Sequence, residues 1–425
     1  MPLRTRIACG LLLGSVVACC AQAQPHGALA ATQWALPNFS DALEVSVSNP
    51  AAQPINGLAT IDIDAARKVA PGFPGTLALV VENRQGTRFL PSQVDAGTSG
   101  SAHGAFVFAV KLAPHEREQL SIYYSETLRE LLPWPKRAHA THSFGYNQAT
   151  AALESELIGY RTYGGFLLDV QAHRKDEIGL YNSLIGFSRI SAPSALGQDV
   201  LHVGDTLGLG GIFLRSGGEV FRPPFNTPDY AHRPVKPEEP AYRVLSAGPL
   251  RAIVEAQISH WKIGNDEVAL RAVYEMRQDE ENVRCHVWID PLHVSRNYVV
   301  GAGIRNLPQM RKIDEQGLVA LEGIQSPETG TIALGLAYSP QLAQRAGELP
   351  TADDESQIVL FDGSLRAGTS VTGQYAVAAA WQGSGWSDPL SHLEHILREE
   401  MADPVLQLGS HQRNPQPHEL ESEPQ

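Results

Sequence analysis

Three consecutive segments show the clearest pattern in this sequence: AIVEAQISHWK (residues 252–262), EVALRAVYEMR (267–277) and NVRCHVWID (282–290). Apolar and polar residues alternate in each of them, which is the period of a β-strand with one buried face. Gly264-Asn265-Asp266 and residues 278–281 lie between the segments and predict tight turns. We therefore expect an antiparallel meander of three long strands within a large curved sheet.

Short strand patterns separated by Gly, Pro and Asn turns continue on both sides of this meander. They predict a mainly β protein with a small N-terminal β-sandwich-like layer at residues 34–125. A larger β domain is expected at residues 144–408. The segment between them, residues 126–143, is expected to be a connector because Pro133 and Pro135 would interrupt a helix.

The end of the chain carries two further signals. Ser387-Asp388-Pro389 followed by an apolar stripe predicts a short C-terminal helix to about Met401. Residues 409–425 contain few apolar side chains, and we expect them to be disordered.

The beginning of the chain predicts export. In residues 1–23, Arg4 and Arg6 precede an apolar run that is too short to span a membrane, as in a signal peptide. Cleavage after Ala23 would release a soluble periplasmic or secreted protein. A competing pattern around Cys19 resembles a bacterial lipobox, and lipidation there would give an outer-membrane lipoprotein. Both patterns predict that the mature domain leaves the cytoplasm.

Composition limits the class of partner. The 425 residues are 43% hydrophobic and 19% charged, which excludes a disordered, fibrous or membrane-spanning chain. A net charge of −13 argues against nucleic acid as a partner, and against a membrane surface unless Cys19 is lipidated. Three of the four cysteines lie in the leader, so no internal disulfide is expected. Cys285 falls on the apolar side of its strand and is expected to be buried.

Cofactor motifs are missing from the sequence. It has no phosphate-binding glycine loop, nucleophile elbow or zinc signature, so we predict no cofactor and no metal site. Asp199 and Asp205 could hold calcium, although they lack a calcium-loop pattern. His392 and His395 are spaced three residues apart on the predicted helix, but without a third ligand in register a solvated helix face is the better interpretation.

The polar side of the meander has the chemistry of a sugar site. Alternation places on that side Glu255, Gln257, Arg271, Glu275, Arg284, His286 and Trp288. Glu275 should lie opposite Arg284, Arg271 opposite Trp288, and Glu255 opposite Glu275. An indole can stack on a pyranose ring, a guanidinium can bind a uronate carboxylate, and carboxylates or histidine can move protons. The alternative is a solvated sheet face held by structural ion pairs.

A second polar group lies earlier in the sequence. Arg161 and Tyr163 are two residues apart and would share one face of a strand, where they could bind a carboxylate. Arg161 could equally neutralise Glu154 or Glu156. We expect the residues of this group and those of the meander to meet at one cleft.

At these residues the chain resembles a family of exported bacterial proteins, domain of unknown function 4861. The resemblance rests on Val47-Ser48-Asn49-Pro50, residues 90–95, residues 153–164, residues 199–208 and Gly248-Pro249-Leu250-Arg251. It implies a galactose-mutarotase-like β-supersandwich and a role in the use of uronate-containing polysaccharides.

The chain also departs from that family's pattern. Leu153, Ser155 and Leu157 replace Trp, Asn and Arg, and residues 191–196 replace a His-rich segment. If the His-rich segment supplies acid–base groups in the family, this member is altered or inactive.

Together these signals predict an exported carbohydrate-active protein whose partner is an acidic oligosaccharide. As a glycoside hydrolase or polysaccharide lyase it would use Glu154, Tyr163, Glu275 and His286 to move protons. Its substrate-binding residues would be Arg161, Asp199, Glu255, Arg271, Arg284 and Trp288. The alternatives are a non-catalytic glycan-binding or scaffold protein and, by analogy of fold, a sugar mutarotase or epimerase.

Overall fold

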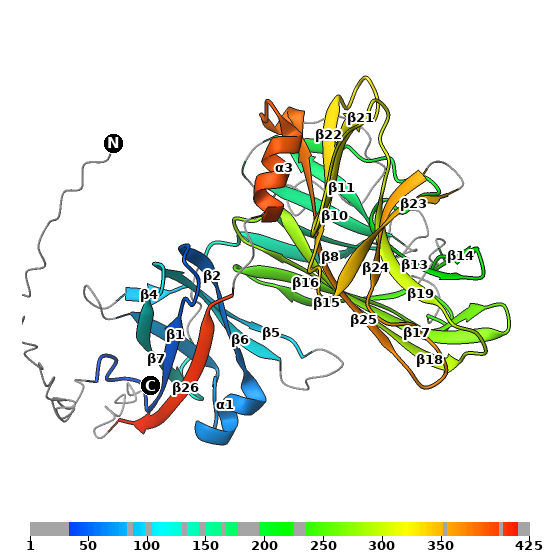
Figure 1. Ribbon diagram of the computed structural model, residues 1–425. Coiled ribbons are helices and arrows are strands. Elements are labelled where there is room, and N and C mark those ends of the chain that lie inside the picture. Colours follow the sequence, from blue (N-terminus) through cyan, green and yellow to red (C-terminus); the bar gives the residue numbers. More distant parts are fainter. Residues whose placement is uncertain are drawn as a thin grey trace, which may run out of the picture.

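A computed structural model of the protein describes residues 34–82, 88–97, 104–129, 134–143, 150–163, 166–174, 176, 178, 195–224, 235–351, 355–398 and 403–414. The predicted signal peptide, its Cys19 and the tail beyond residue 414 lie outside these ranges. The described chain is mainly β, with a smaller N-terminal domain and a large domain (Figure 1). No helix in these ranges is long and apolar enough to cross a membrane.

The N-terminal domain consists of two antiparallel sheets around one apolar core. One sheet has the strand order β26-β1-β7-β3-β4 and the other the order β2-β6-β5. The elements are β1 (Asp41–Ser48), β2 (Ile55–Asp62), α1 (Ile63–Val69), β3 (Leu77–Glu82), β4 (Arg88–Leu90), β5 (Ser92–Asp95), β6 (Ala105–Leu112), β7 (Arg117–Ser125) and β26 (Val405–Arg413). Val45, Ile61, Phe106 and Ile122 are among the side chains that the two sheets bury together. The small sandwich-like layer expected from the strand patterns is confirmed.

Strand β26 brings the far end of the sequence into the N-terminal domain. It runs antiparallel to β1, so that Val405 pairs with Ser48 and Arg413 with Asp41 (red beside blue in Figure 1). The expectation of disorder from residue 409 is therefore wrong for residues 409–413. Backbone pairing with β1 holds these residues, and such pairing does not require the apolar side chains on which the prediction relied.

The large domain consists of two larger sheets. One has ten strands in the order β23-β24-β19-β13-β11-β10-β9-β8, with β12 beside β11 and β14 beside β13; the other has eight in the order β15-β16-β17-β18-β25-β22-β21-β20. The first contains β8 (Ala138–Ser143), β9 (Thr150–Ser155), β10 (Ile158–Tyr163), β11 (Leu167–His173), β12 (Gly197–Asp199), β13 (Leu209–Ser216), β14 (Glu219–Phe221), β19 (Val299–Arg305), β23 (Ala343–Pro350) and β24 (Glu355–Phe361). The second contains β15 (Ala241–Ala247), β16 (Arg251–Ile263), β17 (Asp266–Arg277), β18 (Asn282–His293), β20 (Arg311–Glu315), β21 (Leu318–Ile324), β22 (Thr331–Tyr338) and β25 (Val371–Trp381). Strand β8 begins inside the expected connector because its backbone already pairs with β9 from Ala138 onward.

The two large sheets pack against each other through their apolar faces. One continuous core contains Leu153 and Tyr160 from the ten-stranded sheet and Val254 and Tyr274 from the eight-stranded sheet. Cys285 lies in the same core, as expected. Since side chains alternate along a strand, the polar residues of each sheet point away from this core. The large domain therefore has two outward polar faces on opposite sides of the sandwich.

Helix α3 (Pro389–Arg398) covers one end of the outward face of the eight-stranded sheet, after a short 3-10 turn, η2 (Gln382–Ser384). Leu393 shares a buried apolar cluster with Ala333 of β22 and Ala378 of β25, whose small side chains let the helix approach the sheet. The short C-terminal helix expected from the capping pattern is confirmed.

The meander forms as expected, with one change of register. Glu275 pairs with Arg284 and Arg271 with Trp288, which confirms two of the three predicted pairs. Glu255 pairs instead with Val273, so the predicted pairing with Glu275 is wrong. The register of β16 and β17 changes at a β-bulge between Ile258 and Trp261, and the turn residues alone did not predict this bulge.

Candidate functional site

A row of polar side chains crosses the outward face of the ten-stranded sheet. In register, His139 of β8 pairs with Glu154 of β9, and Glu154 pairs with Gly159 of β10. Gly159 pairs with Gln171 of β11, and Gln171 with Asp199 of β12. The strands thus bring together residues that are up to sixty positions apart along the chain.

Arg161 joins two carboxylates beside this row. Its Nη2 lies 2.7 Å from Asp169 Oδ2 and 3.6 Å from Asp199 Oδ2. Asp169 is buried, with a side chain 2% exposed, and also accepts hydrogen bonds from the Val170 amide at 2.9 Å and from Gln171 Nε2 at 3.3 Å. The Asp199 side chain is 21% exposed, so it is the carboxyl of this pair that a ligand can reach.

The environment of Asp199 favours its protonated form. Burial, followed by the charge of Asp169, raises the pKa of Asp199 to about 8, while Arg161 and a hydrogen bond from Gln171 act in the opposite direction. A carboxyl group with this pKa keeps its proton at neutral pH. Asp199 can therefore donate a hydrogen bond to an anionic ligand or a proton to a leaving group.

A buried histidine and glutamate lie behind this pair. His173 Nε2 of β11 is 3.4 Å from Glu154 Oε2 of β9. Strand β10 lies between them, and its Gly159, which pairs with Glu154, has no side chain to keep the two apart. His173 Nδ1 lies 3.2 Å from the Glu156 carbonyl oxygen, which can only accept a hydrogen bond, so Nδ1 carries a proton and Nε2 faces the carboxylate. Glu154 is fully buried, with a relative exposure of 0%. Glu154 therefore lies beside His173 but cannot touch a ligand directly.

The sequence analysis did not name Asp169, Gln171 and His173 among its candidate residues. All seven residues of β11 are buried, and these three alternate with apolar ones in LLDVQAH. A buried polar residue at every second position was the signal available for finding them. Tyr163 ends β10 opposite Leu167, and its side chain lies outside the described residues.

The residues of the meander do not join this site. Glu255, Arg271, Glu275, Arg284, His286 and Trp288 lie on the outward face of the eight-stranded sheet. The apolar core of the sandwich separates them from Arg161 and Asp199. The expectation that both groups meet at one cleft is therefore wrong. Alternation predicts which side of a strand is polar, but it does not reveal that two strands belong to opposite sheets.

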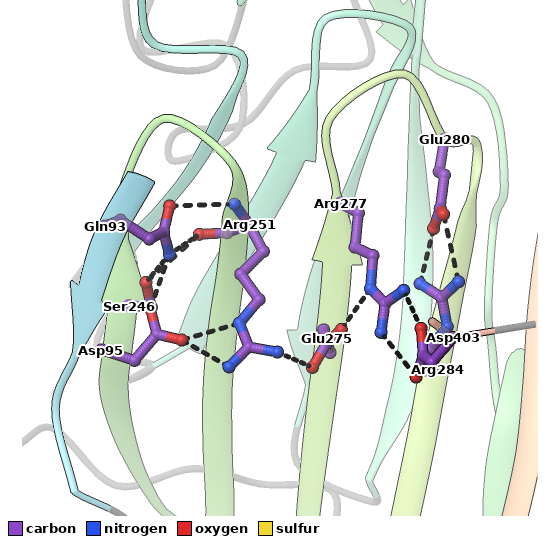
Figure 2. A network of polar contacts seen from close by, with 9 residues as sticks. All are labelled: Gln93, Asp95, Ser246, Arg251, Glu275, Arg277, Glu280, Arg284 and Asp403. Atoms are coloured by element: carbon purple, nitrogen blue, oxygen red, sulfur yellow. Dashed lines mark hydrogen bonds and ion pairs between the residues drawn. The ribbon is translucent and has the colours of Figure 1, made fainter. Parts of the chain in front are cut away.

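Glu275 links the two domains (Figure 2). Its carboxylate lies 3.1 Å from Arg251 Nη1 and 2.6 Å from Arg277 Nε. Arg251 also binds Asp95 of the N-terminal domain at 2.5 Å, and Arg277 binds Asp403 in the segment that leads to β26, also at 2.5 Å. The surrounding arginines outweigh burial and lower the pKa of Glu275 to about 2. Glu275 is thus a structural group that is ionised at neutral pH, which argues against its predicted role in proton transfer.

The other polar residues of this face are also engaged with one another. Arg271 lies over the Trp288 ring, with Cζ 3.8 Å from the ring centroid, and so covers one face of the indole. The buried Glu255 lies 3.5 Å from Arg271 Nη1. Arg284 binds Glu280 through two nitrogens, at 2.6 and 3.0 Å. These contacts match the alternative interpretation of this face, a sheet surface held by structural ion pairs.

His286 stacks beside Trp288, with ring centroids 6.1 Å apart. Burial lowers the pKa of His286, and Arg284 lowers it further, while Glu275 raises it. His286 is therefore mostly neutral at pH 7 and lies among residues that are already paired.

The two acids considered for calcium are separated. Asp199 lies beside Arg161, whereas Asp205 forms an ion pair with Arg222. Within the described ranges, no group of three or more His, Cys, Asp or Glu side chains is arranged to hold a metal ion. His392 binds Glu281 and does not face a metal-like cluster.

Comparisons with known proteins place the chain in a family. Two solved structures resemble its fold: a protein in the glycosyl hydrolase family 38 from Enterococcus faecalis, with 8% identity and a TM-score of 0.49, and an alpha-mannosidase from Enterococcus faecalis V583, with 7% identity and a TM-score of 0.48. Both comparisons cover 87% of this chain but only 47% and 46% of the other chains, so it spans about half of their length. No curated protein matches the chain. Residues 57–400 match the family described as "Domain of unknown function (DUF4861)", and the chain therefore belongs to that family.

Proposed function

We propose that the protein is an exported carbohydrate-active protein that binds and acts on acidic, uronate-containing oligosaccharides. Its site is the outward face of the ten-stranded sheet around Arg161, Asp169 and Asp199. The observation that carries the proposal is the contact of one arginine with two carboxylates, of which the reachable one, Asp199, has a pKa raised to about 8.

A protonated Asp199 suits an acidic sugar for two reasons. It can donate a hydrogen bond to a uronate carboxylate, which an ionised aspartate would repel. It can also protonate a glycosidic oxygen, as the general acid of a glycoside hydrolase does. Burial, together with the charge of Asp169, keeps Asp199 protonated, and Arg161 limits the cost of holding two acids together. Hydrolysis and β-elimination both need such a group.

The proposal includes the place of action and the partner. The pattern of residues 1–23 supports export to the periplasm or beyond, with anchoring in the outer membrane if Cys19 is lipidated. A net charge of −13 disfavours nucleic acid and anionic membrane surfaces as partners. An acidic oligosaccharide is small enough to be held by local groups such as Arg161 despite that charge.

The test is a panel of galacturonate, glucuronate and mannuronate oligosaccharides, each saturated and 4,5-unsaturated. Binding is measured by calorimetry, and products by chromatography and by the absorbance of a conjugated uronate. We expect wild-type protein to turn over at least one member below pH 8 and to lose activity above it, as Asp199 gives up its proton. Asp199→Asn should remove turnover, whereas Asp290→Asn on the opposite sheet should not.

The outcomes separate the classes of function. New ultraviolet absorbance indicates elimination, and new reducing ends without it indicate hydrolysis. Binding without turnover across the pH range would leave a glycan-binding protein and reject the enzyme. If no member of the panel binds, the proposed function is wrong.

A further inference from the structure

A cavity of about 240 Å³ lies between the N-terminal domain and the large domain. On the N-terminal side its wall contains Asn56 of β2 and Lys111 of β6. On the other side it contains Pro249 and Gln278, and Trp134 adds an indole from the segment that connects the domains. None of the described residues that line this cavity belongs to the site around Asp199.

A second cavity, of about 440 Å³, shares Trp134 and Pro249 in its wall. The two cavities therefore adjoin at these residues. Small-molecule sites often lie at domain interfaces and have volumes of roughly 300–1,000 Å³. The domain junction thus offers room for a sugar residue and a neighbour in the same oligosaccharide.

The two sides of the junction are fixed relative to each other. Leu250 shares a buried apolar cluster with Leu58 and Val107 of the N-terminal domain. Gln93 Oε1 of β5 accepts hydrogen bonds from the Leu250 amide at 2.7 Å and from the Arg251 amide at 3.1 Å, within the network of Figure 2. A cavity with walls held in this way loses little conformational freedom when a ligand binds.

Three polar side chains of the wall are available to a ligand. Lys111 and Asn56 occupy paired positions on β6 and β2 and are exposed, and Gln278 is half-buried. None of these three side chains forms a hydrogen bond or an ion pair with another described residue. An amide can donate to and accept from sugar hydroxyls, and an ammonium group can bind a carboxylate.

The other charged side chains of the wall are paired or buried. Glu82 lies 3.3 Å from Arg88, and Arg137 donates to Asp279 at 2.9 Å. Glu118 is buried, with a relative exposure of 5%. The charge that a ligand can neutralise is therefore the positive charge of Lys111, which favours an anionic ligand.

We propose that the domain junction is a second saccharide site, which binds an acidic sugar through Lys111, Asn56 and Gln278. The carboxylate of the sugar would bind Lys111, and its hydroxyls would bind the two amides. Its apolar C–H face would lie against Trp134. A pyranose suits this wall because it has apolar faces and a polar rim. The inference rests on the proposed function for the class of ligand and adds to it a binding site apart from Asp199.

The test is calorimetry on the full chain with the uronate oligosaccharide of the panel that wild type binds most tightly, and with its carboxyl-reduced, neutral counterpart. We expect wild type to bind two acidic ligands, one at each site. Lys111→Gln should weaken one of the two binding events roughly tenfold and leave binding of the neutral ligand unchanged. Trp134→Ala should weaken binding of both ligands at the junction. Lys68→Gln is the matched control, since Lys68 is an exposed lysine on α1 of the same domain. Circular dichroism verifies that each variant is folded.

The results distinguish the two proposals. If wild type binds one ligand and Lys111→Gln binds it equally well, while Asp199→Asn loses turnover, the junction site is wrong and the proposed function stands. If binding depends on Lys111 and Trp134 but no member of the panel is turned over, the enzyme is wrong and the junction site stands. If Lys111→Gln weakens the acidic and the neutral ligand equally, the role of Lys111 in binding the carboxylate is wrong. If wild type binds no member of the panel, both proposals fail.

Discussion

Replacing Glu275 by glutamine should destabilise the protein at neutral pH by an amount that the structure allows us to calculate. The folded pKa of Glu275 is about 2, against 4.5 for an unperturbed glutamate. Each unit of difference corresponds to about 1.4 kcal/mol, so the carboxylate contributes about 3 kcal/mol to the free energy of unfolding. This agrees with the low end of the roughly 3–5 kcal/mol expected when one partner of a buried ion pair is removed. The low end is reasonable because Arg251 keeps Asp95 and Arg277 keeps Asp403.

The dependence on pH follows from the lowered pKa. The stabilisation by Glu275 is fully present above about pH 4.5 and is lost as the pH falls through 2. The difference between wild type and Glu275→Gln should therefore shrink in acid. Urea denaturation at pH 7 and pH 2.5 measures it, with tryptophan fluorescence and far-UV circular dichroism as two probes of a shared transition.

Glu267→Gln is the matched control for this experiment. Glu267 lies on the same strand, but its side chain is 29% exposed and its partner is His260 at 3.0 Å. An exposed pair of this kind contributes about 0.5 kcal/mol. A loss below about 1 kcal/mol in Glu275→Gln at pH 7, or a loss that stays constant down to pH 2.5, would refute the reasoning.

Three further results are expected. The folded pKa of Asp199 is raised, so the stability that Asp199 contributes is present below about pH 3.8 and is lost as the pH rises through about 8. Between these two pH values the free energy of unfolding of Asp199→Asn should rise relative to that of wild type by roughly 1.4 kcal/mol per pH unit. Urea denaturation measures this difference. Tyr160→Phe should cost about 1–2 kcal/mol in the same assay, because the buried hydroxyl donates to Glu281 O at 2.6 Å and accepts from the Ala379 amide at 3.0 Å; an unchanged midpoint would contradict this. Removal of residues 404–425 deletes β26 and should make β1 sensitive to proteolysis while the large domain stays resistant, and a cleavage pattern identical to that of the full chain would count against it.

Several elements could be predicted because their signal is local. The three strands of the meander, the C-terminal helix and the buried Cys285 all follow from periodicity within about a dozen residues. The pairing of Glu275 with Arg284 also followed, since one short turn joins their strands. The partner of Glu255 did not follow: the register set at the turn, Ile263 with Asp266, leads to Tyr274, and a bulge inside β16 that leaves no clear pattern in the sequence moves it one residue further, to Val273.

The candidate site shows where such prediction ends. The sequence pattern indicates Arg161 and Asp199 as candidate binding residues. It also led us to expect the polar residues of the meander at the same cleft, and that expectation is wrong. Sheet membership depends on which strands pair across long stretches of chain, and the core formed by Leu153 and Val254 separates the two groups. Asp169 was not recognised because its importance lies in its contact with Arg161, eight residues earlier across a hairpin.

The amino-acid sequence alone determines that this is a mainly β protein of a recognisable family, because alternation and short motifs express local backbone preferences and burial of one strand face. Tertiary structure alone decides which charged groups are neighbours. Asp199 holds a proton because it is buried and lies beside Asp169, and Glu275 stays ionised because Arg251 and Arg277 surround it. Electrostatic energies depend on the distance and solvent exposure of groups in space, and neither quantity is encoded in the separation of residues along the chain.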